Sequence, residues 1–165
     1  METLPLQLSN AIDRTLAHLH PDKLRNACFD LIERYSRGEF IESEAHRHAY
    51  MASRLPATYG ATRQVFRRIE PFLNPSKSLL DLGAGMGALA WAAAETMPHL
   101  RRITLFEGDV EMLRMGQYLT QNNLDPLEIS WCRDDITQAV SFPAHDVVVL
   151  SYVLNELSLK EQAHV

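Results

Sequence analysis

A glycine-rich turn constrains the fold of this chain more than any other feature. Its residues, Asp81-Leu82-Gly83-Ala84-Gly85-Met86-Gly87, follow a short apolar run that begins at Ser78 and precede an Ala-rich stretch from Leu89 to Met97. Glycines let the backbone turn sharply and approach a ligand closely, and the first turn of a helix offers unpaired N–H groups. The order of strand, glycine-rich turn and helix therefore predicts the first unit of an α/β fold whose ligand lies at the turn.

The second half of the chain repeats this alternation of strands and helices. Short apolar runs predict further strands at residues 102–107, 127–131 and 146–151, with a helix at 110–119 after the first of them. Strands that alternate with helices at this spacing indicate βαβ units and a parallel sheet covered on both faces. We therefore predict an α/β fold that contains the first four parallel strands of a Rossmann-like sheet, in the spatial order 3-2-1-4. Such a sheet usually continues with further strands, so we expect a fragment of a longer protein.

The first part of the chain is predicted to be helical instead. Apolar residues recur at three- and four-residue steps through residues 8–19, which is the pattern of an amphipathic helix, and Pro21 opens a second helix. A third helical segment is expected to stop at Pro56, and a fourth, over residues 57–72, to end at the prolines beyond residue 70. We divide the chain into a helical N-terminal region, residues 1–75, and the N-terminal half of a Rossmann-like domain, residues 76–165.

Charge and cysteine content exclude several classes of protein. The net charge is −5, with about +1 over residues 1–75 and about −6 over residues 76–165, so the whole chain is not an obvious polyanion binder. Cys28 and Cys132 lie far apart without a CxxC spacing, which predicts neither a disulfide framework nor a metal site. The chain has no run of about 18 apolar residues and no secretory or transit signal at its N-terminus. We expect a cytoplasmic protein that does not enter a membrane.

The glycine-rich turn also fits the dinucleotide-binding pattern G-x-G-x-x-G/A, with Gly83, Gly85 and Ala88. Glu107 ends the second predicted strand about 20 residues later, where a carboxylate can accept hydrogen bonds from ribose hydroxyls. These residues alone fit a nicotinamide cofactor as well as S-adenosylmethionine (SAM). They also have a structural interpretation, as a plain turn and a solvated strand end.

Three further features favour SAM. Asp81 precedes the first glycine at a position that is usually apolar in nicotinamide-binding domains, and in SAM-dependent enzymes an acid there faces the cationic amino-acid end of the cofactor. Asp134-Asp135-Ile136 follows the third strand, where an acid and an apolar residue suit adenine, although a turn or helix cap is the alternative. The segment 151–157 ends the fourth strand, at the expected cofactor–substrate junction. The predicted cofactor residues are Asp81, Gly83, Ala84, Gly85, Gly87, Glu107, Gly108, Asp134, Asp135, Ile136 and Ser151.

Three segments together resemble one known family. They are Arg54-Leu55-Pro56-Ala57-Thr58-Tyr59, residues 79–85 and Ser151-Tyr152-Val153-Leu154-Asn155-Glu156-Leu157. The family is the methyltransferase-like family associated with the small ribosomal subunit, which has bacterial members and mitochondrial ribosome-assembly members. It lies within the class I SAM-dependent methyltransferases, so the resemblance implies their Rossmann-like fold.

The resemblance also implies binding of SAM and association with small-subunit ribosomal RNA or the small ribosomal subunit. Our leading hypothesis is a methyltransferase that acts on this RNA. Some members resemble assembly factors, so a non-catalytic or SAM-binding assembly factor is the alternative. A small-molecule methyltransferase is a further one, and Asp81 makes a nicotinamide-dependent oxidoreductase the least favoured. Members also tend to carry a Cys-rich region that binds an iron–sulfur cluster, which we expect here only if such a region exists beyond residue 165.

Polar residues at the predicted junction are the candidates for catalysis. Asn155 can orient a methyl acceptor, Glu156 can take a proton, and Tyr152 lies beside them. The alternative, that Asn155 and Glu156 cap the following helix, fits the same residues. Because SAM is an activated donor, holding donor and acceptor in line is the main task expected of such a site.

Basic side chains of the N-terminal region are candidates for RNA contact, because arginines bind phosphates and stack on unpaired bases. They are Arg37, His46, Arg47, His48, Arg54, Arg63, Arg67 and Arg68. Interspersed acids such as Glu42 and Glu44 favour a solvated helix face instead. The corner at residues 54–59 has two interpretations. It is either a helix–Pro–helix bend with Arg54 paired to a carboxylate, or a corner that folds over the SAM pocket.

Overall fold

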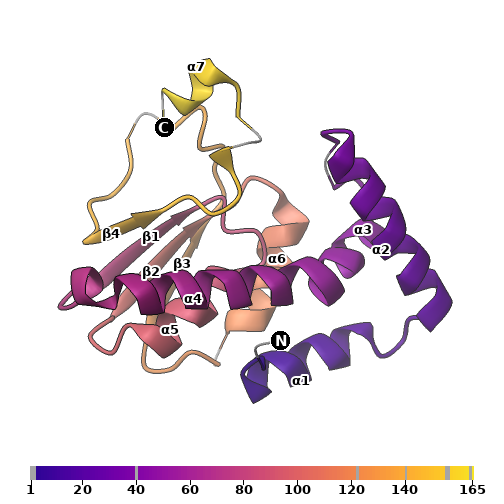
Figure 1. Ribbon diagram of the computed structural model, residues 1–165, viewed down its shortest axis with the longest axis horizontal. Helices are drawn as coiled ribbons and strands as arrows, with labels where there is room; N and C mark the ends of the chain where they lie inside the picture. The colour runs from indigo at the N-terminus through magenta and orange to yellow at the C-terminus, as the bar shows by residue number, and fades with distance from the viewer. Residues whose placement is uncertain (1–2, 40, 122, 140, 155–156, 164) are drawn as a thin grey trace.

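Four parallel strands form the centre of the molecule (Figure 1). The computed structural model describes residues 3–39, 41–121, 123–139, 141–154, 157–163 and 165. The strands are β1 (Ser78–Leu82), β2 (Arg102–Phe106), β3 (Glu128–Cys132) and β4 (Val147–Val149). Their order in the sheet is β3-β2-β1-β4, which confirms the predicted α/β fold and strand order. The helices are α1 (Leu6–Leu16), α2 (Pro21–Ser36), α3 (Glu44–Ala49), the π-helical turn η1 (Tyr50–Arg54), α4 (Leu55–Leu73), α5 (Ala88–Thr96), α6 (Val110–Thr120) and α7 (Leu159–Gln162).

β1 lies between β2 and β4 and brings Asp81 into the middle of the sheet. All of its residues are buried, and Asp81 stands opposite Leu105 of β2 and Val149 of β4. Because side chains alternate along a strand, Asp81 shares a face of the sheet with Leu79, which packs in the core formed with α4 and α5. Asp81 therefore occupies the carboxyl end of β1, where the strand order reverses and α/β sheets usually bind their ligands.

The two faces of the sheet are covered unequally. Helices α1, α4, α5 and α6 share a large core with one face, and Figure 1 shows α4 running across it beside α5. On the other face the described residues form a smaller cluster of Leu80, Leu82, Phe106 and Ile136. The chain that follows β3 and β4, including Phe142, packs against this cluster. In the described part of the chain these helices cover only the first face, and the second is partly covered, with Val148 of β4 52% exposed.

The chain is helical without a break from Glu44 to Leu73, whereas the sequence predicted a stop at Pro56. A proline in a helix lacks an N–H group and its ring crowds the preceding turn. Here the turn before Pro56 is widened, because the Leu55 N–H group bonds the Tyr50 carbonyl five residues back. The prediction for Pro56 was wrong because a π-helical turn makes room for the ring. Pro71 likewise lies inside α4, which ends two residues later.

Helix α4 fastens the N-terminal helices to the sheet. Tyr59 and Phe66 are almost fully buried in the shared core. The Tyr59 hydroxyl and the Arg63 guanidinium both donate hydrogen bonds to the Glu95 carboxylate of α5. Figure 1 shows α2 and α3 continuing from this attachment to one side of the sheet. In the described part of the chain, no helix combines the length and the apolar character that crossing a membrane requires.

Candidate cofactor-binding site

A pocket of about 770 Å³ lies where the strands of the sheet end. Every residue that the sequence predicted for cofactor binding lines this pocket, except Gly87. Tyr152, one of the three candidates for catalysis, lines it as well. The carboxyl ends of parallel strands form the usual ligand crevice of an α/β sheet. The site therefore combines residues from the ends of all four strands, as expected from the sequence.

The glycine-rich turn adopts a backbone that side chains rarely allow. Gly83, Gly85 and Gly87 have φ angles of +78°, +57° and +80°. A Cβ atom on Gly83 would lie 2.2 Å from Val153 Cγ2, and one on Gly85 would lie 2.9 Å from the Tyr50 hydroxyl oxygen. These close approaches leave no room for a methyl group. The turn is therefore held tightly between the segment after β4 and the N-terminal helices.

Gly87 packs against a different part of the molecule from the other two glycines of the turn. It precedes the first residue of α5, and a Cβ atom there would lie 3.2 Å from Trp131 Cζ2. A Cβ atom on Gly116 of α6 would lie 2.3 Å from Cη2 of the same indole ring. Gly87 thus makes space for Trp131 and does not line the pocket, and its role in cofactor binding stays a prediction.

Asp81 is the most unusual side chain of the pocket. It is 1% exposed, and neither of its carboxylate oxygens has a hydrogen-bond partner among the described residues. Burial, together with the nearby charge of Glu107, raises its pKa to about 7. Leaving a buried polar group without a partner costs free energy, so native structures rarely contain one. A ligand that brings a cationic or hydrogen-bond-donating group to Asp81 would remove this cost.

Glu107 is bonded to the backbone of both loops beside it. Its Oε2 accepts a hydrogen bond of 2.7 Å from the Gly85 N–H group, and its Oε1 accepts one of 2.8 Å from the Asp109 N–H group. Burial raises the pKa of Glu107, and these backbone bonds oppose the rise. Glu107 is therefore not a solvated strand end. A carboxylate has about four acceptor positions, so it can still accept bonds from ligand hydroxyls.

The segment after β3, residues 134–136, lines the pocket, and Asp135 also caps a turn. Ile136 is 7% exposed and packs with Phe106 on the second face of the sheet. Asp135 accepts hydrogen bonds of 2.7 Å from the Thr137 hydroxyl and 2.9 Å from its N–H group, and these bonds lower the pKa of Asp135. Asp135 therefore caps a turn, which was the structural alternative for this segment, while Asp134 and Ile136 line the pocket beside it.

The segment after β4 contains the candidates for catalysis. Ser151 and Tyr152 line the pocket. Tyr152 has a φ angle of +65° and is 63% exposed, so its ring lies largely outside the core. Asn155 and Glu156 fall outside the described residues, and their proposed roles stay predictions.

The N-terminal helices supply a second wall of the pocket, which sequence reasoning largely missed. We call this set the helical wall: Tyr35, Ile41, Tyr50, Arg54, Ala57 and Thr58. The Arg54 guanidinium carbon lies 5.1 Å from the centre of the Tyr35 ring, which is cation–π geometry. The helix is continuous at residues 54–59, so neither predicted corner forms there, but Arg54, Ala57 and Thr58 line the pocket.

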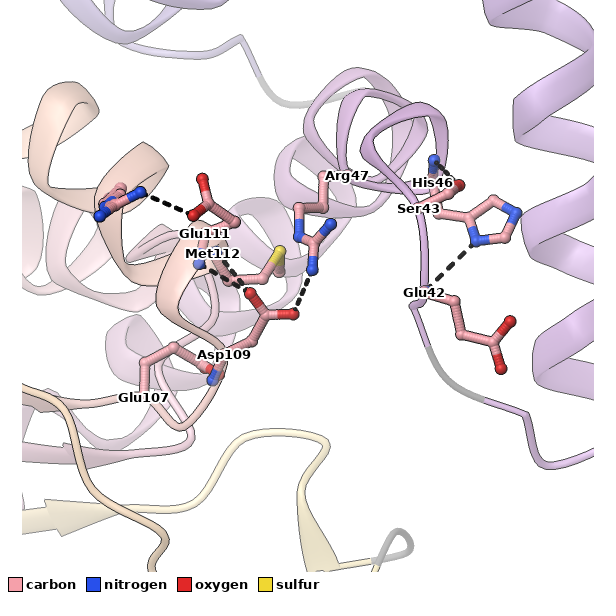
Figure 2. Close-up of polar contacts among 9 residues, drawn as sticks. Glu42, Ser43, His46, Arg47, Glu107, Asp109, Glu111 and Met112 are labelled. Atoms are coloured by element: carbon pink, nitrogen blue, oxygen red, sulfur yellow. Dashed lines mark hydrogen bonds and ion pairs between the residues drawn. The ribbon is translucent and has the colours of Figure 1, made fainter.

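An ion pair joins the helical region to the loop that follows β2 (Figure 2). Arg47 of α3 donates a hydrogen bond of 2.7 Å to Asp109 Oδ2. The other oxygen of Asp109 accepts from the N–H groups of Glu111 and Met112 and so caps α6. Burial alone would raise the pKa of Asp109, but the bonds from Arg47 and these N–H groups outweigh it and lower the pKa. The backbone N–H group of Asp109 also donates a hydrogen bond to Glu107. Through Asp109, the helical region is therefore connected to the pocket.

Other basic residues of the N-terminal region have internal partners as well. His46 lies 2.6 Å from Asp30, and Arg37 pairs with Glu39. These contacts, with those of Arg47 and Arg63 described above, engage four of the eight basic side chains within the protein. Arg67 and Arg68 are exposed on α4, and contact with RNA stays a prediction. Among the described residues no group of three or more His, Cys, Asp or Glu is arranged to hold a metal ion. Cys28 and Cys132 are free thiols on separate elements, so they do not supply the ligand set of an iron–sulfur cluster.

Comparison with known proteins agrees with this architecture. A family model described as "Mitochondrial small ribosomal subunit Rsm22" matches residues 44–165, which is about three quarters of the chain. No curated protein matches the chain at a significant level.

Several solved structures of methyltransferases and related proteins resemble the chain. SAM-bound CalS10, an amino pentose methyltransferase from Micromonospora echinaspora, is 19% identical, with a TM-score of 0.54 over 77% of this chain and 54% of its own. The mitomycin 7-O-methyltransferase MmcR is 19% identical, with a TM-score of 0.57 over 73% of this chain and 33% of its own. The pyocyanin biosynthetic protein PhzM is 22% identical, with a TM-score of 0.51 over 71% of this chain and 32% of its own. The chain thus spans between about a third and about half of these proteins, and the likeness shows the fold.

Proposed function

Because this chain belongs to the Rsm22 family of mitochondrial small ribosomal subunit proteins, we propose that it binds SAM and transfers its methyl group to small-subunit ribosomal RNA. The observation that carries the cofactor part is the buried carboxylate of Asp81, which has no partner in the described part of the chain. The SAM-bound relative CalS10, which shares the fold, supports the same assignment. The RNA part rests on the family alone.

The residues of the pocket fit the chemical groups of SAM. Asp81 would take the ammonium group of the methionine part, and Glu107 the ribose hydroxyls. Asp134 would face the adenine amino group, and Ile136 its ring. Gly85, which has no side chain, would let the backbone come close to the ligand. When bound, SAM supplies a methyl group activated by its sulfonium charge.

Charge also matches the ligand to the pocket. Asp81, Glu107, Asp134 and Asp135 line it, and SAM carries a net positive charge from its sulfonium. A cleft lined by one sign of charge attracts ligands of the opposite sign. The protein's own contribution to the reaction would be to hold the donor and the acceptor in line and to exclude water between them.

A second candidate function is a small-subunit assembly factor that binds SAM without catalysis. The observation that favours it is the family description, which names a component of the small ribosomal subunit. The two candidates share the cofactor site and differ only in methyl transfer. Incubation of the protein with radiolabelled SAM and small-subunit particles separates them. Label in the RNA supports the methyltransferase, and SAM binding without label supports the assembly factor.

Isothermal calorimetry with SAM and S-adenosylhomocysteine tests the cofactor site itself. We expect micromolar binding by the wild type and its loss in Asp81→Ala. Glu128→Ala is the matched control, because Glu128 is an exposed carboxylate of β3 that does not line the pocket. A well-folded wild type that binds neither compound would overturn the proposal.

A further inference from the structure

The helical wall provides the pocket with a cation where the ligand needs one. Resting on the proposed cofactor, we infer that Arg54 binds the carboxylate of the methionine part of SAM. Asp81 and Arg54 line the same pocket, one from the end of β1 and the other from η1. The ammonium and carboxylate of the ligand's amino-acid end would then each meet a side chain of opposite charge.

The charges of the pocket make this assignment specific. Among the described lining residues, Arg54 is the one with a cationic side chain. The lining residues with carboxylates are Asp81, Glu107, Asp109, Asp134 and Asp135. A carboxylate that entered such a pocket without a cation would meet repulsion from several acids at once. Arg54 supplies the opposite charge, and its planar group can bond both oxygens of a carboxylate together.

Arg54 is held in place but makes no ion pair with a carboxylate in the described part of the chain. Its guanidinium lies over the ring of Tyr35, at 5.1 Å from the ring centre. Stacking on an aromatic face leaves the edge of the guanidinium, with its N–H donors, available to a ligand. This differs from Arg47 and Arg63, whose guanidinium groups already bond Asp109 and Glu95.

The backbone around Arg54 is already held in position before a ligand binds. The π-helical turn η1 contains Arg54, and such turns are frequent at functional sites. The same turn carries Tyr50, whose hydroxyl lies against Gly85 of the glycine-rich turn. Just before η1, the ion pair of Arg47 with Asp109 fastens the helix to the start of α6. Arg54 thus projects from a segment that is already held against the pocket, which lowers the entropy lost on binding.

The experiment compares two ligands that differ only in the amino-acid end. S-adenosylhomocysteine carries the ammonium and carboxylate, whereas 5′-methylthioadenosine lacks both. Calorimetry would measure both ligands with the wild type, Arg54→Gln and Arg54→Lys. Arg63→Gln is the matched control, since its ion pair lies outside the pocket.

We expect Arg54→Gln to weaken S-adenosylhomocysteine about tenfold to a hundredfold, which is the usual effect of a lost charged hydrogen bond. Binding of 5′-methylthioadenosine should change less than about twofold. Arg54→Lys should recover part of the affinity, because it keeps the charge and loses the paired geometry.

Several outcomes would overturn the inference. An equal loss for both ligands, with an unchanged melting temperature, would mean that Arg54 shapes the wall and does not bind the carboxylate. Unchanged binding of S-adenosylhomocysteine by Arg54→Gln would exclude the contact. If the wild type bound neither ligand, the proposed cofactor itself would fail, and that result is distinct from failure of the Arg54 contact alone.

Discussion

The two walls of the pocket are built in opposite ways. The sheet wall, formed by the residues at the ends of the strands, contains buried side chains such as Asp81 and Phe106 and glycines that tolerate no Cβ atom. The residues of the helical wall are half-buried or exposed, and side-chain contacts hold them. On the proposed assignment, the sheet wall determines which chemical groups the ligand must carry. The helical wall then adds affinity, and its side chains can change without loss of the fold.

The largest expected effect comes from Asp81 of the sheet wall, whose ionisation should make the free energy of unfolding depend on pH. Its pKa lies near 3.8 in the unfolded chain and about 7 in the folded protein, so folding favours the protonated form. The stability that this provides is complete below pH 3.8 and is lost as the pH rises to 7. Between pH 5 and pH 8 the free energy of unfolding of the wild type should fall by about 3 kcal/mol relative to Asp81→Asn.

Urea unfolding of both proteins at several pH values measures this difference. Carboxylates with lowered pKa values, such as Asp109, shift stability in the opposite direction, but they are present in both proteins and cancel. A difference between wild type and Asp81→Asn that does not vary with pH would show that Asp81 keeps its ordinary pKa.

A pair of glycines tests how little room the sheet wall leaves. Gly83 and Gly38 have similar φ angles, +78° and +73°, but only Gly83 would bring a Cβ atom against another side chain. Gly38→Ala should cost about 1 kcal/mol from backbone strain alone. Gly83→Ala should cost about 3 kcal/mol, because strain and the clash with Val153 add. Thermal unfolding of the two variants compares them directly, and equal losses would mean that Val153 moves aside freely.

The pH dependence of ligand affinity distinguishes Asp81 of the sheet wall from Arg54 of the helical wall. We expect the affinity to change about tenfold through Asp81 and not to change through Arg54. Asp81 must be ionised to bind an ammonium group, so S-adenosylhomocysteine should bind about tenfold more weakly at pH 6 than at pH 8. Arginine stays charged throughout this range. The same pH dependence should therefore persist in Arg54→Gln at lower overall affinity. Calorimetry at the two pH values measures it, and a wild-type affinity that is flat with pH would contradict the role of Asp81.

The smallest expected effect concerns the ion pair that connects the helical region to the pocket. Arg47 and Arg63 have side chains of nearly equal exposure, 16% and 15%, and they pair with Asp109 and Glu95. Only the partner of Arg47 lies beside Glu107. Arg47→Ala should weaken S-adenosylhomocysteine about fourfold, whereas Arg63→Ala should leave it unchanged. Equal effects of the two substitutions on affinity would show that the helices act only through overall stability.

The sheet and its acids could be predicted because their signals are local. Each strand is a short apolar run, and the glycine-rich turn after the first run indicates the Rossmann-like type of sheet, whose strand order is 3-2-1-4. Asp81 and Glu107 were found because parallel strands place their carboxyl ends together. The contact of Gly87 with Trp131 could not be predicted, because the pattern of glycines does not distinguish room for a ligand from room for a side chain.

The helical wall could not be predicted in the same way. Tyr35, Ile41 and Tyr50 share no spacing or motif, and only the tertiary fold brings them to one pocket. The resemblance at residues 54–59 pointed to Arg54 but left its contacts open. The absence of a partner for Asp81 in the described structure is also a tertiary property, since it depends on every element packed around β1.

The π-helical turn η1 also fixes the number of residues that the chain can have between α3 and α4. An α-helix rotates by about 100° with each residue, so a change of one residue alters the phase of everything that follows. The turn contains one residue more than an α-helical turn and sets the phase between α3 and α4. Deleting one residue from 50–54 would rotate α4 relative to α3 by about 100°. Arg47 and Arg63 could then no longer reach Asp109 and Glu95 from the same continuous helix.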